Sequence, residues 1–521
     1  MSKITRHTSK TIKRYDITAI VFCIAILSLG LVIGYFHKVG DFGVETDFYG
    51  AYAVQAGNIL EGRPYTYQYL PPGYSLLLAC VSLVTGDFFV AAKIISAFAT
   101  GIFGWITYVL LRALFHSRIA LASTILLLLA LIPYSFLVAT DIVGAVAIIL
   151  PLCILLRRPV LTLNACFLSG ILSGVAYLVR TNGLFVILGI VFSLLFINLN
   201  QETLGKCLVK VGFFICGVLL ITSPWFIYNW QTNGSPLASK VYLQIAAHIY
   251  QPGGTNSGTT HIQIASKFHS LGEVVLYNPQ KFLLTYLTGI LKDNILPLLT
   301  QSLSFPAYLF CGSGLLLLLV EFSRKREDLS RRRLTFFLVC FFGYLLLGLT
   351  GFVLRYYFFL FPFLFLLVTY FLFQRYIFTA LGDVPFFRIA VSWILVLILA
   401  VSQSIIAYRK TSSSIASDPI YLLEIADFLR NRSSPHDIII ARKPHLAYLS
   451  GLRREFPLAE TADDFLLKAR EIGARYIVYS DFDASLWPGL KSLRDPSALP
   501  KSFKLIYSHK QSHMLLYKID N

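Results

Sequence analysis

The run Ile17–Phe36, ITAIVFCIAILSLGLVIGYF, is apolar from end to end and holds no charged side chain. Roughly 20 apolar residues carry a helix across the hydrocarbon core of a bilayer, so this run predicts a membrane span. A basic segment precedes it and no small-residue cleavage site follows it, which favours a retained first span over a signal peptide. Similar runs follow at 88–111, 119–138, 141–156, 163–179, 183–199, 208–228, 303–322, 334–352, 356–373 and 388–408. The sequence therefore predicts about eleven transmembrane helices.

The composition excludes a water-soluble globular protein. Of the 521 residues, 56% are hydrophobic and 14% are charged, and the mean hydropathy is +0.68. Soluble domains are about a quarter charged, so a chain of this composition needs a lipid solvent over much of its surface. The net charge of +18 does not indicate nucleic-acid binding, because the basic residues are dispersed in short loops between apolar runs.

The distribution of Lys and Arg predicts the orientation in the membrane. Alternate loops are rich in both, with the largest cluster between residues 324 and 333, and the loops between them are poor in both. Cytoplasmic loops carry this excess, so we expect an integral, multi-pass membrane protein with a cytoplasmic amino terminus. An odd number of spans then places the carboxyl terminus outside. Two loops, 37–87 and 229–302, are long and extracytoplasmic in this arrangement.

The tail after Tyr408 differs from the rest of the chain, because charges rise and amphipathic segments alternate with short β-rich runs. Asp418–Arg432 and Ala462–Gly473 have helical patterns, the second ended by Gly. Strand patterns occur at Asp437–Ala441, Arg475–Ser480, Phe503–Ser508 and Met514–Ile519. The predicted fold is an all-α polytopic membrane bundle over residues 1–408, followed by a small extracytoplasmic α/β domain over residues 409–521.

Residues with metal-binding chemistry show no ligand spacing. The eight cysteines, at 23, 80, 153, 166, 207, 216, 311 and 340, all lie in apolar stretches. They form no disulfide framework, and packing roles suit them best. The histidines of the second loop and the tail, His248, His261, His436 and His445, also lack a metal-ligand pattern. No metal site is predicted, and no phosphate-cradling glycine loop follows a strand.

The first long loop is the most informative segment for function. Residues 39–86 read VGDFGVETDFYGAYAVQAGNILEGRPYTYQYLPPGYSLLLACVSLVTG. Apolar and aromatic residues recur at helical spacing between Asp47 and Glu61, and a second helical run begins after Pro71 and Pro72. Both runs are amphipathic and aromatic, as expected of helices that lie in the membrane interface. Such a loop is typical of an enzyme that works on a lipid at the outer interface.

Three acidic residues are candidates for chemistry. Asp47 opens the first helical run, and Glu45 lies two residues before it. Thr46 or Asp47 could cap the helix, or Asp47 could be a general base that takes a proton from an acceptor hydroxyl or amine. Asp141 begins the fourth span, where it either favours the helix dipole or works as a functional ionisable group at membrane depth. Both interpretations stay open for each residue.

Two arginines lie on the side of the membrane where cations are depleted. Arg180 sits in the turn LVRTNGL between spans five and six, and Arg355 sits in the turn VLRYYFF between spans nine and ten. Each could snorkel to lipid headgroups at a helix end. The alternative is that each holds a phosphate, for which a guanidinium fork is well suited.

The order of these features resembles the GT-C glycosyltransferases, in the branch of protein O-mannosyltransferases and the lipid A aminoarabinose transferase. The resemblance covers most of residues 15–375. Its matching features are the early acidic residue, AYAVQAGNILEGRPY, the PPGY segment, the acidic start of span four, LVRTNGL and RYYFFLFP. No single motif is very specific, whereas their order and membrane sidedness together are.

The resemblance implies that a sugar moves from a polyprenyl-phosphate-linked donor to an extracytoplasmic acceptor, usually with inversion. The acceptor would be a lipid, an envelope glycan or a protein. Asp47 would be the catalytic base, with Asp141 in the same pocket, and Arg180 and Arg355 would stabilise the departing phosphate. Phe48 follows Asp47 where the protein mannosyltransferases have a paired Asp-Glu, so Glu45 is the candidate partner. A lipid-monophosphate donor requires no metal in principle.

Other functions stay open. A secondary transporter or flippase for a lipid-linked glycan predicts two related halves and charges at mid-bilayer depth, whereas the ionisable residues here cluster at outer helix ends. A non-catalytic envelope scaffold would use the tail and tolerate replacement of the candidate residues. A glycan ligase or polymerase would keep the chemistry but use a pyrophosphate-linked donor.

Overall fold

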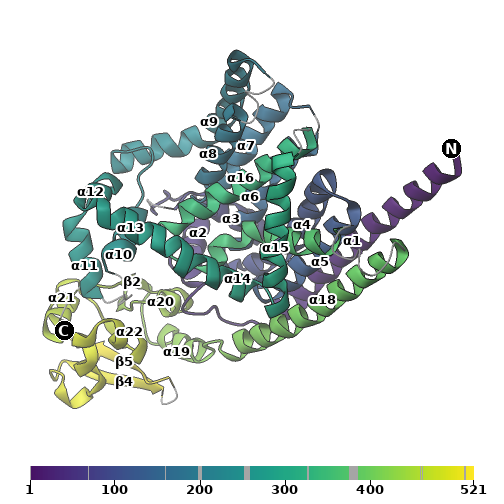
Figure 1. Ribbon diagram of the computed structural model, residues 1–521. Helices are drawn as coiled ribbons and strands as arrows, with labels where there is room; N and C mark the ends of the chain where they lie inside the picture. Colours follow the sequence, from purple (N-terminus) through teal and green to yellow (C-terminus); the bar gives the residue numbers. More distant parts are fainter. Residues whose placement is uncertain are drawn as a thin grey trace. The chain divides into compact units, whose positions relative to one another are not determined.

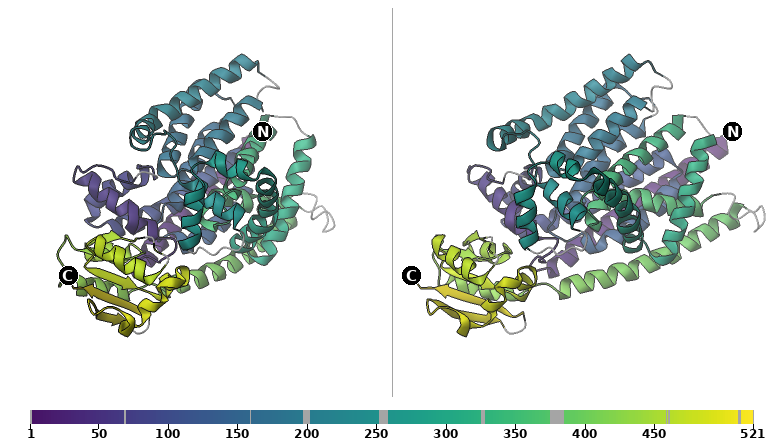
Figure 2. Two further views of the ribbon diagram at one scale, coloured as in Figure 1. Left: turned by 90° about the vertical axis from the view of Figure 1, so that its left-hand side faces the viewer. Right: turned by 60° about the vertical axis from the view of Figure 1, so that its left-hand side comes forward.

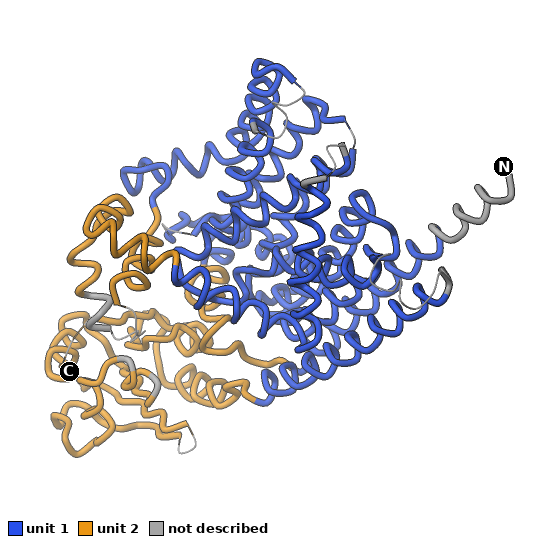
Figure 3. The backbone as a smooth tube through the Cα atoms, in the orientation of Figure 1, with its two compact units in different colours: residues 1–36, 55–238, 288–416 blue, residues 37–54, 239–287, 417–521 orange. Residues whose placement is uncertain are grey.

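The computed structural model describes residues 2–67, 70–158, 160–196, 202–251, 258–324, 328–374, 385–457, 459, 461–509 and 512–520. The chain forms two compact units, coloured separately in Figure 3. Unit 1 comprises Met1–Phe36, Gln55–Ala238 and Thr288–Ala416. Unit 2 comprises His37–Val54, Ser239–Leu287 and Ser417–Asn521, so it joins parts of both long loops to the tail.

Unit 1 is a bundle of long helices (Figure 1). Its helices from the first part of the chain are α1 (Ser2–Phe36), α2 (Ala53–Leu60), α3 (Gly73–Thr85), α4 (Phe88–Leu114), α5 (Ser117–Leu131), α6 (Asp141–Arg157), α7 (Leu163–Val179), α8 (Gly183–Phe196) and α9 (Leu204–Asn233). The later ones are α13 (Pro279–Gly289), α14 (Leu296–Ser302), α15 (Phe305–Arg324), α16 (Asp328–Gly348), α17 (Phe361–Leu372) and α18 (Pro385–Ala416). Two residues of α2 and most of α13 belong to unit 2.

Each predicted span coincides with a helix of the described chain, which confirms the predicted membrane bundle. Eight helical segments are long and apolar enough to cross a membrane, namely Lys13–Phe36, Phe88–Leu114, Ser117–Tyr134, Leu204–Asn233, Pro279–Ser302, Phe305–Phe322, Leu354–Leu372 and Phe387–Arg430. The predicted spans 141–156, 163–179 and 183–199 lie in the shorter helices α6, α7 and α8, and residues 197–199 lie outside the described residues. Residues 325–327 of the basic cluster lie outside them as well.

Pro279–Ser302 is a candidate span that the sequence analysis had placed in the second long loop. Lys281, Lys292 and Asp293 interrupt its apolar pattern, so no apolar run stood out. The chain segments that make up unit 2 argue against a membrane crossing by Pro279–Ser302. Its segments Ser239–Leu287 and Ser417–Asn521 form one compact unit and must lie on one side of a membrane, which requires an even number of crossings between them. The four predicted spans between them satisfy that condition, and a fifth would break it.

Close helix packing in unit 1 depends on glycine. A Cβ atom added at Gly170 of α7 would lie 2.0 Å from the carbonyl oxygen of Phe214 in α9, and one at Gly174 would lie 3.0 Å from that of Val218. The absent side chains let the two backbones approach, as small-xxx-small motifs do in membranes. The GxxxG spacing therefore marks a real helix contact.

The tail forms a five-stranded mixed sheet with helices packed against it (Figure 2). Its strands are β1 (Ile438–Ile440), β2 (Arg453–Glu455), β3 (Tyr476–Tyr479), β4 (Phe503–His509) and β5 (Met514–Ile519), in the order β2-β1-β3-β5-β4. β1 pairs in parallel with β2 and β3, and β5 is antiparallel to β3 and β4. The tail helices are α19 (Tyr421–Arg430), α20 (His445–Ser450), α21 (Ala462–Glu471) and α22 (Asp481–Leu486). This confirms a small α/β fold in the tail, which begins at Ser417 and not at residue 409, because α18 continues to Ala416.

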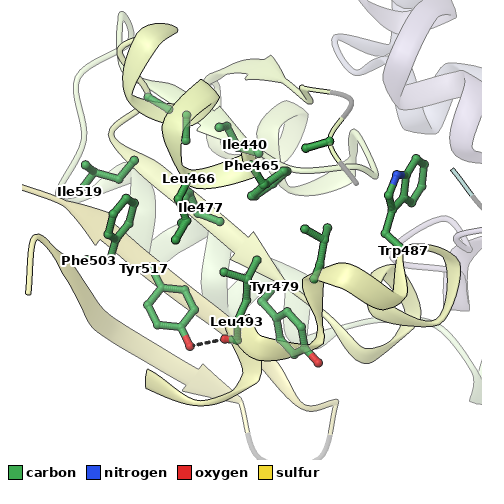
Figure 4. Close-up of a cluster of buried hydrophobic side chains, with 14 of the residues drawn as sticks. Ile440, Phe465, Leu466, Ile477, Tyr479, Trp487, Leu493, Phe503, Tyr517 and Ile519 are labelled. Atoms are coloured by element: carbon green, nitrogen blue, oxygen red, sulfur yellow. Dashed lines mark hydrogen bonds between the residues drawn. The ribbon is translucent and has the colours of Figure 1, made fainter. Parts of the chain in front are cut away.

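Both faces of the sheet are buried. Ile440, Ile477 and Tyr517 belong to one core with Phe465 and Trp487, shown in Figure 4. Their neighbours Ile439, Tyr476 and Leu516 belong to a second core, together with Leu422 and Ile425 of α19 and Val39 of the first long loop. Successive strand residues point to opposite faces, so one sheet supplies both cores. The second core packs the start of the first loop onto the tail domain. Unit 2 also contains α10 (Val241–Tyr250), α11 (Gly258–Lys267) and α12 (Leu271–Tyr277) from the second loop.

Candidate functional site: a cation cluster and an anchored carboxylate

Arg180 and Arg355 converge on Asp141 within unit 1. Asp141 is the first residue of α6, and its side chain is only 5% exposed. Nη1 of Arg180 donates to Oδ1 of Asp141 at 2.5 Å, and Nη1 of Arg355 lies 3.6 Å from Oδ2. Two guanidinium groups against one carboxylate leave a net positive charge, which suits an incoming anion.

Local packing fixes both arginines. Arg180 directly follows α7 and also donates to Oγ1 of Thr140 at 2.9 Å. Arg355 belongs to the 3-10 helix Leu354–Leu360. The ring of Tyr356 lies 4.6 Å from Cζ of Arg180 and 5.4 Å from Cζ of Arg355. Side-chain exposures of 17% and 18% show that both arginines are largely covered by the rest of the chain.

Asp47 is an exposed carboxylate at the start of the π-helix Phe48–Tyr52, within unit 2. Its backbone is already helical, and its side chain makes no capping hydrogen bond. The hydroxyl of Thr46 donates to the carbonyl of Phe42 at 2.7 Å and accepts from Nζ of Lys443 at 3.1 Å. The side chain of Asp47 therefore does not cap this segment. Short π-helical segments occur frequently at functional sites, and this one was not predicted.

Glu45 lies just before this π-helix in the chain and is fully buried in a hydrogen-bond network. It accepts from Nε2 of His37 at 3.0 Å and from the backbone N–H of Asp41 at 2.8 Å. The other ring nitrogen of His37 lies 2.9 Å from Oδ1 of Asp418, and the backbone N–H of Lys38 donates to Oδ2 of Asp418. An imidazole between two carboxylates donates from both nitrogens when it is protonated. Burial acts to lower the pKa of His37, but the hydrogen bonds to Asp418 and Glu45 raise it to about 9.

Two more residues of the tail, Lys443 and His445, contact the first long loop close to Asp47. Lys443 donates to the carbonyl of Phe42 and to Oγ1 of Thr46. Nε2 of His445 lies 2.9 Å from the carbonyl oxygen of Asp41, and the His445 ring packs 4.3 Å from that of Tyr49. Burial lowers the pKa of His445 to about 4, so the ring is neutral and donates to Asp41. Sequence reasoning missed His37, Asp418 and Lys443, and for His445 it noted only that a metal-ligand pattern is lacking.

Among the residues that the structure describes, no group of three or more His, Cys, Asp or Glu side chains could hold a metal ion. Asp141 is engaged with two arginines, and Glu45 with a histidine and a backbone amide. The candidate residues thus form two separate clusters, a cation cluster in unit 1 and an anchored carboxylate in unit 2.

Known proteins share this architecture. The profile of the family described as dolichyl-phosphate-mannose-protein mannosyltransferase matches residues 70–228, which include Asp141 and Arg180. Curated proteins give no sequence match. The structure is similar to ArnT from Cupriavidus metallidurans bound to undecaprenyl phosphate, at 15% identity and a TM-score of 0.59, over 95% of this chain and 97% of that one.

A second similar structure is the oligosaccharyltransferase AglB from Archaeoglobus fulgidus, in complex with an inhibitory peptide and a dolichol-phosphate. It shares 11% identity at a TM-score of 0.56, over 88% of this chain and 69% of that one. At these identities the likeness is one of fold. The chain therefore shares the fold of these two membrane proteins, and its residues 70–228 match the model of the dolichyl-phosphate-mannose-protein mannosyltransferase family.

Proposed function

We propose that the chain transfers a sugar from a polyprenyl-phosphate-linked donor to a hydroxyl or amine of an extracytoplasmic acceptor, with inversion at the anomeric carbon. The observation that carries this proposal is the convergence of Arg180 and Arg355 on Asp141. ArnT and AglB have been solved with undecaprenyl phosphate and dolichol-phosphate, which supports a lipid phosphate as the ligand of this cluster.

The charge of the cluster matches the charge of the reaction. A sugar linked through a lipid monophosphate carries one negative charge, and the two arginines and Asp141 together carry one positive charge. When the bond from the anomeric carbon to the phosphate oxygen breaks, the electron pair stays on the phosphate. Because the arginines are already in place, they stabilise that developing charge more strongly than the charge of the bound donor.

Asp47 supplies the other half of the reaction in this proposal. The acceptor oxygen or nitrogen forms its bond to the anomeric carbon, and its proton passes to the Asp47 carboxylate. Exposure of Asp47 makes the carboxylate available to substrate. We assign Glu45 a positioning role, because it is buried against His37 and the Asp41 amide and holds the segment that carries Asp47. The chain's own residues thus provide the base and the leaving-group cations.

Donor consumption tests the proposal. Purified protein in lipid is given a panel of radiolabelled polyprenyl-phosphate sugars, a pyrophosphate-linked glycan and membrane extract as acceptor. We expect transfer from a monophosphate donor, at least 100-fold slower in Arg355→Ala. Arg63→Ala, an exposed arginine of the first loop paired with Glu61, is the control and keeps wild-type transfer. Transfer from the pyrophosphate-linked donor alone would replace this proposal with the ligase alternative.

A further inference from the structure

A pocket in the tail domain lies at the carboxyl ends of two adjacent parallel strands. Arg442 and Lys443 follow β1, and Ser480 and Asp483 follow β3. Its volume is about 490 Å³, including the part open to solvent. Open α/β sheets bind ligands in the crevice beyond the carboxyl ends of their strands, because the loops that leave neighbouring strands diverge there.

The polar side chains of this pocket are held in place before any ligand arrives. Ser480 is the N-cap of α22, and its Oγ accepts from the backbone N–H of Asp483 at 3.1 Å and donates to Oδ2 of Asp483 at 2.7 Å. Nη1 of Arg442 lies 3.7 Å from Oδ1 of Asp483. Cζ of Arg442 also lies 5.3 Å from the centre of the Trp487 ring, which supports the guanidinium from one side.

The charged side chains that line this pocket carry a net positive charge. Two neighbouring cations, Arg442 and Lys443, line the pocket with only one carboxylate, Asp483. Burial lowers the pKa of both cations, and Arg442 lowers that of Lys443 further by repulsion. Lys443 also anchors the first loop through Phe42 and Thr46, whereas Arg442 lines the pocket 3.7 Å from Asp483. The net positive lining therefore suits a bound anion.

We propose that this pocket binds an anionic sugar, with its phosphate or carboxylate against Arg442 and Lys443. The ring hydroxyls are placed to donate to Asp483 and to exchange hydrogen bonds with Ser480 and Ser512, which also line the pocket. The apolar lining, from Phe42, Tyr421, Leu422, Leu446, Val478 and Met514, suits the faces of a sugar ring.

The position of the pocket indicates that this sugar belongs to the acceptor, an assignment that rests on the proposed function. Phe42 of the first loop lines the pocket, and Lys443 bonds to the Phe42 carbonyl and to Thr46, the residue before Asp47. The pocket and the proposed base therefore share one loop within unit 2. The inferred acceptor is a glycan that carries a phosphate or a carboxylate.

Equilibrium binding to the full chain tests this inference without any transfer. The probe is radiolabelled mannose 6-phosphate, and the protein is held in phosphatidylcholine nanodiscs. We expect saturable binding to wild type and to Asp47→Asn, and at least tenfold weaker binding of neutral mannose. Arg442→Gln is expected to weaken binding at least tenfold, and Arg442→Lys less. Arg453→Gln is the matched control, because Arg453 lies on β2 of the same sheet and is mostly exposed.

Several outcomes overturn the inference. These are the absence of saturable binding, equal binding of mannose, or an equal loss in Arg442→Gln and Arg453→Gln. Loss of binding in nanodiscs that contain phosphatidylglycerol would assign the pocket to a lipid headgroup and overturn the acceptor assignment. Transfer without mannose 6-phosphate binding would leave the proposed function standing and remove only this inference. Binding of mannose 6-phosphate without transfer from any donor would contradict the proposed function. It would leave the anionic-sugar pocket standing but remove its assignment to the acceptor.

Discussion

Arg180 donates to Asp141 across 2.5 Å, and Arg355 approaches the other oxygen of the same carboxylate. The pair joins the end of α7 to the start of α6, and Arg355 comes from a segment more than a hundred residues further along the chain. Asp141 thus organises the two cations that we assign to the donor phosphate.

Removing that carboxylate tests its organising role. Asp141→Asn raises the charge of the cluster by one and loosens both arginines. We expect the KM for donor to fall or stay unchanged, because a more positive cluster binds the donor anion at least as well. We expect kcat to fall at least tenfold, because the cations are no longer fixed where charge develops. Steady-state kinetics at several donor concentrations measure both. A normal kcat would contradict the role.

The guanidinium fork itself is expected to matter, beyond its charge. Arg180→Lys and Arg355→Lys keep a cation but lose planar, bidentate donation to phosphate oxygens. We expect kcat/KM for donor to fall about tenfold or more in each. Arg63→Lys, in the exposed Arg63–Glu61 pair, is the control and is expected to behave as wild type. Wild-type kinetics in both cluster variants would show that a point charge is sufficient.

The His37 network predicts a loss of stability at alkaline pH. The folded pKa of about 9 lies above the unfolded value of 6.5, so protonated His37 stabilises the folded state fully below pH 6.5. This contribution, at most on the order of 3 kcal/mol, is lost as pH rises through about 9. Hydrogen exchange of residues 37–54 is expected to accelerate between pH 7 and pH 9.5, after correction for intrinsic exchange. His37→Gln should abolish this dependence.

His445 provides the matched control, because its folded pKa of about 4 is depressed and its effect has the opposite sign. Its neutral form stabilises the fold above pH 6.5, and that stabilisation is lost as pH falls towards 4. His445→Gln should therefore change the acid side of the profile and leave the alkaline side intact. An alkaline transition that survives in His37→Gln would contradict the assignment to His37.

The membrane topology can be tested with impermeant labels. His269→Cys in the second loop and Ser497→Cys in the tail both replace exposed residues of unit 2. In a cysteine-free background, we expect an impermeant maleimide to label both from the same side of sealed vesicles. Labelling from opposite sides would show that Pro279–Ser302 crosses the membrane. Lys13→Cys at the amino-terminal end of the first span is the reference for the other side.

Local patterns in the sequence predicted most of the fold. Apolar runs and helical periodicity predicted the spans and the tail helices. The apolar face of such an element is formed by residues of one short segment, so its pattern is visible in the sequence. β2 was missed, since Arg453–Glu455 is short and charged. The predicted membrane side of Arg180 and Arg355 made both residues candidates for a function, because Lys and Arg are depleted in loops on that side.

The partners of the candidate residues could not be predicted in the same way. Asp418 is separated from His37 by 381 positions, and no local pattern relates the two. Lys443 is likewise far in the sequence from Phe42 and Thr46, to which it donates. The sequence analysis therefore found the carboxylates and arginines but neither the network that buries Glu45 nor the tail residues that anchor the loop.

The central claim is that Asp47 takes the proton of the acceptor, and single-turnover transfer tests it most directly. Donor-loaded protein is mixed with acceptor, and Asp47→Asn is compared with wild type and with Glu61→Gln, an exposed acid of the same loop. We predict transfer slowed at least 100-fold in Asp47→Asn, with donor affinity unchanged and Glu61→Gln normal. Transfer by Asp47→Asn at the wild-type rate would contradict the assignment of the base.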